Sequence, residues 1–172
     1  NKLKKVLTSL FFFAILKTDK TYCFTRVLGE IIMKISTKGR YGVAAMYDLA
    51  LHYGEGPIAL KQIALRQEIS EHYLEQLIST LRNAGYVNSI RGPQGGYILA
   101  KDPKDITIGD VIKTMEGPIT LVDCLLTDDT ENNYCEKVGK CVTRDVWVKV
   151  RDSINNVLNS ISLADLCKED RK

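Results

Sequence analysis

Three cysteines, Cys124, Cys135 and Cys141, lie in one polar stretch of the sequence, separated by ten and five residues. The residues between them are rich in Asp, Asn and Thr, which is typical of a loop. In a reducing compartment such cysteines are poor disulfide candidates and better metal ligands, because thiolates bind zinc and iron–sulfur clusters. From the residues alone, an iron–sulfur cluster, a zinc ion and unliganded thiols remain equal alternatives.

The sequence does not indicate which residue would complete such a site. The candidates nearest in the sequence are Asp123, Glu136 and Asp145. Cys167, a further thiol, lies beyond the next helix. No combination of an acid, a base and a nucleophile is evident, so we do not expect an enzyme.

Two helices are expected to position the cysteine loop, Thr107–Glu116 before it and Val142–Ser160 after it. In the second helix the apolar residues step by three or four along one face: Val146, Val150, Ile154, Val157, Leu158 and Ile161. At a rise of about 1.5 Å per residue, this helix is roughly 25 to 30 Å long. A helix of this length is too exposed for so small a domain unless another surface covers its apolar face. We expect the same helix of a second subunit to cover it, with packing against its own domain as the alternative. Cys141 is expected at the helix N-terminus, where the helix dipole favours a thiolate.

Residues 70–99 form a second stretch whose residue types indicate a function. Ser70 is a helix cap and Gly85 a helix stop. Two strand-like runs follow, at Val87–Ile90 and Tyr97–Leu99, on either side of a Gly/Pro-rich loop. A helix that leads into a hairpin in this way is typical of a winged helix-turn-helix DNA-binding domain.

Two further helices are predicted upstream, over residues 41–53 and 60–68, and only Ile69 and Ser70 separate the second from the helix that follows. The expected fold class is therefore mainly α with a small β-wing, a winged helix-turn-helix domain followed by a long C-terminal dimerisation helix. The expected segments are 33–101 for DNA binding, 102–141 for a short helix and the cysteine-containing sensor loop, and 142–172 for the dimerisation helix and tail.

Side chains on the outer face of the third helix are expected to read DNA. Gln76 can hydrogen-bond adenine and Glu75 can accept from cytosine, while His72 can reach a base or a phosphate. Arg91, before the glycines of the wing, suits a narrow minor groove. With the start of the first helix included, the predicted DNA-binding residues are His72, Glu75, Gln76, Arg91, Lys38, Arg40 and Tyr41.

The charge of +3 is unevenly distributed along the chain. Residues 33–101 hold eight basic and five acidic residues, and residues 102–172 hold ten and fourteen. This asymmetry is consistent with residues 33–101 binding DNA phosphates and residues 102–172 having another function.

Residues 1–32 do not resemble a folded segment. We interpret them as an over-extended reading frame or a disordered extension, because Leu28-Gly29-Glu30 can be encoded by a ribosome-binding site upstream of Met33. An export signal is the alternative, although the apolar run lacks a clean cleavage site and is too short to span a bilayer.

Four segments, KISTKGRYGVAAMYDLA, SEHYLEQLISTLRNAG, IRGPQGGYILAKDP and ITIGDVI, resemble a family of bacterial winged-helix regulators, the Rrf2 family. That family includes the iron–sulfur regulator IscR, the nitric-oxide sensor NsrR and the cysteine-metabolism repressor CymR, and the resemblance runs from Met33 to about Leu166. It implies that His72, Glu75 and Gln76 face the major groove and that Arg91 enters the minor groove.

The resemblance also implies a [2Fe-2S] cluster on Cys124, Cys135 and Cys141, because IscR and NsrR carry three cysteines in this loop. The first gap of ten residues is longer than the five or so of those relatives. IscR takes its fourth ligand from a histidine that matches Arg144, and NsrR from an acid that matches Arg40, and a guanidinium cannot ligate. The fourth ligand is therefore open.

Together these patterns predict a cytoplasmic homodimeric repressor that binds a pseudo-palindromic operator in double-stranded DNA. It would sense iron–sulfur or redox status and control genes for cluster assembly or for cysteine and sulfur supply. One alternative is a cluster-free cysteine-metabolism repressor controlled by a protein partner. The other, from a different class, is a metal or redox carrier protein, with zinc as the alternative to the cluster.

Overall fold

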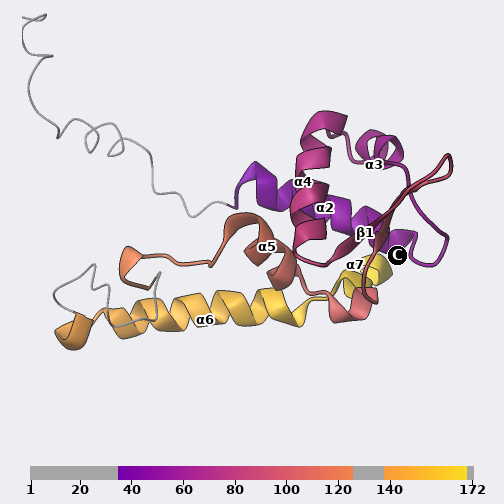
Figure 1. Ribbon diagram of the computed structural model, residues 1–172. Coiled ribbons are helices and arrows are strands. Elements are labelled where there is room, and N and C mark those ends of the chain that lie inside the picture. The colour runs from indigo at the N-terminus through magenta and orange to yellow at the C-terminus, as the bar shows by residue number, and fades with distance from the viewer. Residues whose placement is uncertain (1–34, 126–137, 170–172) are drawn as a thin grey trace, which may run out of the picture. The chain divides into compact units, whose positions relative to one another are not determined.

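The computed structural model describes residues 35–125 and 138–169, so that Cys135 and the whole of residues 1–32 lie outside the described residues. The helices are α2 (Thr37–Leu51), α3 (Leu60–Arg66), α4 (Glu71–Asn83), α5 (Ile108–Glu116), α6 (Arg144–Ser160) and α7 (Leu163–Glu169), and the strands are β1 (Val87–Ile90) and β2 (Gly96–Leu99) (Figure 1). This mainly helical fold with one small sheet confirms the predicted fold class. Over the described ranges, no helix is both long enough and apolar enough to cross a membrane.

The first helix begins earlier than the sequence predicted. The hydroxyl of Ser36 accepts from the backbone N–H of Lys38 at 3.0 Å and of Gly39 at 3.4 Å, so α2 begins at Thr37 and not at Tyr41. A serine in this position satisfies N–H groups that have no partner within the helix. The expected boundary was wrong because Gly39, in the turn that was missed, has a low helix propensity.

The third helix is capped and stopped as predicted. The Ser70 hydroxyl accepts from the N–H of Tyr73 at 3.4 Å. Gly85 has a φ of +79°, and beyond the helix end the N–H of Tyr86 donates to the carbonyl of Leu81 at 3.0 Å. This pattern is the Schellman motif, which needs a left-handed residue and therefore favours glycine.

The wing is a two-stranded antiparallel hairpin in which Val87 pairs with Leu99 and Ile90 with Gly96. Strand β2 is held by two backbone hydrogen bonds between Tyr97 and Ile58, at 3.0 and 2.9 Å, and Ile58 lies just before α3. Gly96 belongs to β2 and not to the expected loop, and a side chain there would collide with the Ile58 carbonyl. The hairpin tip projects from the rest of the described chain (Figure 1).

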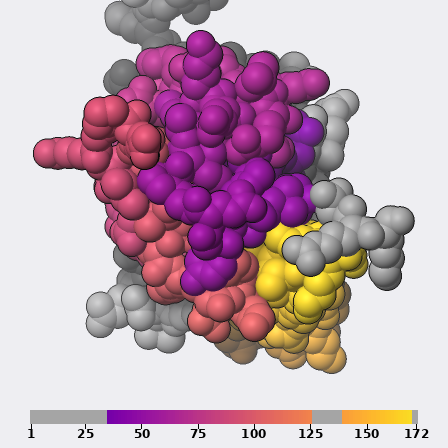
Figure 2. Space-filling view, turned by 90° about the vertical axis from the view of Figure 1, so that its right-hand side faces the viewer, coloured from indigo at the N-terminus to yellow at the C-terminus, as the bar shows by residue number. Residues whose placement is uncertain are grey.

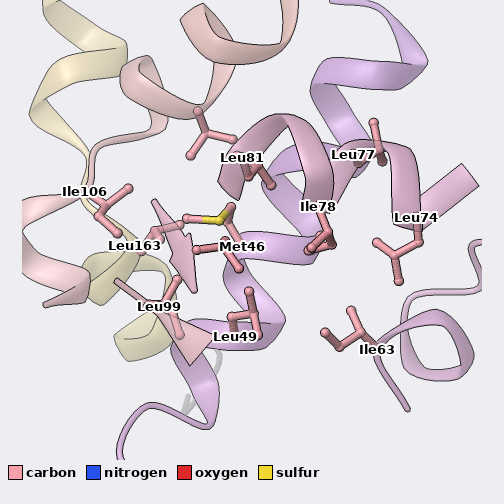
Figure 3. Close-up of a cluster of buried hydrophobic side chains, with 14 of the residues drawn as sticks. Met46, Leu49, Ile63, Leu74, Leu77, Ile78, Leu81, Leu99, Ile106 and Leu163 are labelled. Atoms are coloured by element: carbon pink, nitrogen blue, oxygen red, sulfur yellow. The ribbon is translucent and has the colours of Figure 1, made fainter. Parts of the chain in front are cut away.

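A single hydrophobic core joins the helix-turn-helix to the C-terminal segments. Figure 3 shows the side chains of its centre converging from several elements. The fully buried side chains include Met46, Ile63, Leu74, Ile78, Leu81, Ile106 and Leu163. Ile106 precedes α5 and Leu163 begins α7, so the C-terminal helix contributes to the same core as α4.

Helix α7 lies in the segment that was expected to be a C-terminal tail. Its N-terminus carries a reciprocal cap, in which the Ser162 hydroxyl accepts from the N–H of Asp165 at 3.2 Å and the Asp165 carboxylate accepts from the Ser162 N–H at 3.1 Å. Figure 2 shows the yellow surface of α7 against the indigo and purple surface of the first described elements, and α7 contacts α2.

Helix α6 begins at Arg144, two residues later than expected, and contains no buried residue. Its C-terminal end is attached to the core, because the Ile108 N–H donates to the Ile161 carbonyl and the Leu163 N–H to the Ile106 carbonyl, both at 2.9 Å. The apolar side chains left exposed along α6 and just before it are Val142, Val146, Trp147, Val150 and Val157.

Candidate nucleic-acid interface and cysteine loop

Helix α4 has one buried face and one exposed face. Leu74 and Leu77 are buried on the inner side, while the predicted readers His72, Glu75 and Gln76 are exposed on the outer side. The amide nitrogen of Gln76 lies 3.3 Å from Nε2 of His72, one helical turn away. An amide NH₂ only donates, so the imidazole Nε2 is the acceptor in this pair. Two predicted readers are therefore held together on one side of the helix.

The start of α2 lies against α4. The rings of Tyr41 and Tyr73 meet edge to face, with centroids 6.1 Å apart and an interplanar angle of 73°. This geometry is favourable for aromatic pairs. Lys38 is half-buried, and Arg40 is exposed and donates to the Thr37 hydroxyl at 3.4 Å. Tyr41 therefore has a packing role in addition to the DNA contact predicted for it.

A buried carboxylate fixes α3 to α2, and it was not predicted from the sequence. Asp48 has only 1% of its surface exposed. Its oxygens accept from Arg66 Nε at 2.8 Å, from Arg66 Nη2 at 2.6 Å and from the Gln67 amide at 3.1 Å. The hydrogen bond to Asp48 raises the pKa of the Arg66 guanidinium. The only sequence signal was an aspartate inside the apolar stripe of α2, where a buried charge requires a partner.

The wing carries Arg91 on its exposed tip. The next residue, Gly92, has a φ of +129°, which favours glycine. A side chain at Gly95 would collide with the carbonyl oxygen of Ile90. The glycines are therefore required by the hairpin's own backbone, in addition to any close approach to DNA.

The cysteine loop is described at its two ends. Cys124 lies in a short 3-10 turn, Asp123–Leu125, and is half-exposed, as is Cys141. The sulfur of Cys141 lies 3.2 Å from the Thr143 hydroxyl. Cys141 stands three residues before Arg144, the first residue of α6, and not directly at the helix N-terminus as expected.

The candidates for a fourth ligand are not brought together by the described residues. Cys167 lies on α7 and packs against the core, and Glu136 lies outside the described ranges. Among residues 35–125 and 138–169, no three His, Cys, Asp or Glu side chains come close enough to hold a metal ion. The Nε of Arg144, at the start of α6, is buried and has no hydrogen-bond partner in the part of the chain that is described. The ligand set therefore stays a prediction.

Helices α2 to α4 with the β1–β2 hairpin define a winged helix-turn-helix protein, a class that binds DNA through the helix after the turn. Residues 35–169 match the Rrf2 family, described as "Iron-dependent Transcriptional regulator". The chain belongs to the Rrf2 family of transcriptional regulators.

Similar proteins of known name agree with this assignment. The chain is 49% identical over 134 residues to the HTH-type transcriptional regulator CymR of Bacillus subtilis, a match that covers 78% of this chain and 89% of that protein. It is 42% identical over 134 residues to the HTH-type transcriptional regulator IscR of Serratia proteamaculans, with 78% and 79% covered. These relatives are named as regulators, so the chain is a DNA-binding regulator and not an enzyme.

Two solved structures resemble it as well. T. potens IscR is 52% identical with a TM-score of 0.63, and the match covers 80% of this chain and 88% of that one. The structure of CymR, the global cysteine regulator of B. subtilis, is 47% identical with a TM-score of 0.66, and the match covers 80% of this chain and 98% of that one. The recognition of the family from the sequence is confirmed.

Proposed function

We propose that this chain is a cytoplasmic homodimeric repressor that reads a pseudo-palindromic operator through α4 and the wing. The observation that carries the proposal is the exposed row His72, Glu75 and Gln76 on a helix whose opposite face is buried. Arg91 projects from the adjacent wing. These side-chain types match base edges in the major groove and a narrow minor groove.

The exposed apolar side of α6 supports the dimer. Val146 is 54% exposed and Val157 is 59% exposed, and Trp147 between them is 40% exposed. An apolar row of this length on a helix without buried residues needs a covering surface. The same helix of a second copy provides one by two-fold symmetry, and it places two copies of α4 on successive turns of DNA.

The three cysteines are proposed to bind a [2Fe-2S] cluster whose presence or loss changes DNA affinity. Cys124 and Cys141 are accessible at the two ends of the loop, and thiolates are the ordinary ligands of such clusters. The cluster would supply a group that is sensitive to oxidants and to iron supply, and the chain would respond only as far as the cluster prefers one conformation over another. The regulated genes would be those for cluster assembly or for cysteine and sulfur supply.

One observation favours a second candidate, a cluster-free regulator of cysteine metabolism controlled by a protein partner. Position 144 holds an arginine, which cannot ligate, and the chain is 49% identical to CymR. Purification without oxygen separates the two candidates. A visible absorption band that disappears in Cys135→Ala supports the cluster, whereas a colourless protein that still binds DNA supports the second candidate.

The DNA-reading role has its own test. Gln76→Ala should weaken operator binding by about 1 to 3 kcal/mol and relax selectivity at one base pair, and Arg91→Ala should also reduce the salt dependence of binding. Arg82→Ala is the matched control, because Arg82 is exposed at the far end of the same helix. If Gln76→Ala and Arg91→Ala bind the operator as the parent does, the reading surface has been misplaced.

A further inference from the structure

One carboxylate at the end of α5 closes the start of α2. Oε1 of Glu116, the last residue of α5, accepts from the Ser36 hydroxyl at 2.5 Å, from the Ser36 N–H at 3.2 Å and from the Gly39 N–H at 3.0 Å. Ser36 and Glu116 are eighty positions apart in the sequence. Its three donors include two backbone N–H groups at a helix N-terminus, where the dipole favours a negative charge.

The two helices can approach this closely because α2 has glycines on the contact side. A Cβ at Gly39 would lie 2.5 Å from Oε1 of Glu116, and a Cβ at Gly42 would lie 2.7 Å from Cγ of Met115. The two glycines, one turn apart and both buried, therefore make room for the end of α5. The close contact between α2 and α5 therefore depends on the two glycines and is part of the fold.

The segment that Glu116 holds is the segment predicted to contact DNA. Lys38 lies between the two residues that donate to Glu116, Ser36 and Gly39, and Arg40 follows Gly39 in the first turn of α2. Tyr41 packs on Tyr73 of α4. A flexible first turn would lose conformational freedom each time it bound a phosphate, whereas a fixed one is already ordered.

We infer that Glu116 is a positioning residue for DNA binding, which holds the first turn of α2 so that Lys38 and Arg40 meet the phosphate backbone in a fixed geometry. The inference rests on the proposed DNA-reading function. It also predicts a change in DNA affinity that is opposite to the change expected from charge alone. A carboxylate near DNA repels phosphates, so removal of Glu116 should tighten binding by charge alone, whereas the loss of positioning should weaken it.

The opposite signs make the test decisive. Full-length Glu116→Ala and Glu116→Gln are compared with Asp105→Ala, which removes an exposed carboxylate in another part of the chain. We expect Glu116→Ala to bind operator DNA about tenfold more weakly, with the slope of log affinity against log salt reduced by about 1. Glu116→Gln should retain most of the affinity, because the amide oxygen still accepts, and Asp105→Ala should bind as well as the parent or better. If Glu116→Ala binds as tightly as Asp105→Ala, the inference is overturned.

Amide hydrogen exchange tests the contact independently of DNA. In Glu116→Ala the amides of residues 36–41 should exchange faster than in the parent, while those of α4 should not change. Unchanged exchange in residues 36–41 overturns the inference. If the parent itself does not bind DNA, the proposed function fails, and the exchange result still decides whether Glu116 orders the start of α2.

Discussion

Substitution of Arg66 should show how much of the helix-turn-helix depends on one buried carboxylate. In Arg66→Met, Asp48 keeps only the hydrogen bond from the Gln67 amide and loses both guanidinium donors. Asp48 has 1% of its surface exposed, whereas the Arg66 side chain is 37% exposed, so water can reach the pair only from the guanidinium side. Removal of one partner from a fully buried ion pair destabilises a protein by roughly 3 to 5 kcal/mol, and the remaining amide bond and the solvent access at Arg66 reduce the expected loss to about 2 to 3 kcal/mol.

Urea unfolding followed by circular dichroism, at one fixed protein concentration, measures the effect. Lys61→Met is the matched control, since Lys61 is an exposed cation on the same helix and its loss should change stability by less than about 0.5 kcal/mol. The double variant Asp48→Asn with Arg66→Met should recover part of the loss, because no buried charge remains. A cost for Arg66→Met no larger than that for Lys61→Met would refute the reasoning.

Three further predictions concern the wing, the C-terminal helix and the cysteine loop. Gly96→Ala should destabilise the protein by about 1 to 3 kcal/mol in urea and weaken operator binding, because its Cβ would collide with the Ile58 carbonyl; equal urea midpoints would contradict this. Hydrogen bonds from Lys168 and Ser162 lower the pKa of Asp165, so its carboxylate stabilises the fold above the unfolded pKa of about 4, and this stabilisation is lost as the pH falls through the folded pKa. Asp165→Asn should therefore be less stable than the parent at neutral pH, and the difference in urea midpoint should shrink below about pH 4; a difference independent of pH would exclude this role. Arg144→His should slow the loss of the visible absorption band in air, because an imidazole can ligate where a guanidinium cannot; an unchanged rate would show that residue 144 does not reach the cluster.

Local patterns predicted the elements that depend on neighbouring residues. The cap at Ser70 and the stop at Gly85 are both present, because each is decided within one turn of helix. The start of α2 was placed too late, since Gly39 disfavours a helix in isolation, although Gly42 was included in the predicted helix 41–53. In the folded chain they are needed for contact with Glu116 and Met115, and this packing outweighs the low propensity.

Contacts between distant residues could not be read in the same way. The partner of Asp48 lies eighteen positions away, and Ser36 lies eighty positions from Glu116. Helix α7 had a local signal in the Ser162 and Asp165 capping pair, but the prediction did not use it. For the cysteines, the sequence identifies thiolates as suitable ligands, but a ligand set is defined by positions in space.

The attachment of α6 at one end has a mechanical consequence. Two backbone hydrogen bonds, Ile108 to Ile161 and Leu163 to Ile106, fix the helix where it enters α7. Its seventeen residues make a lever arm of about 25 Å, so a rotation of about 10° around that end displaces the other end by about 4 Å. Cys141 precedes the far end and the core lies at the fixed end. If the proposed cysteine site controls DNA binding, a displacement of a few ångströms at the Cys141 end would reach the core as a rotation of only a few degrees.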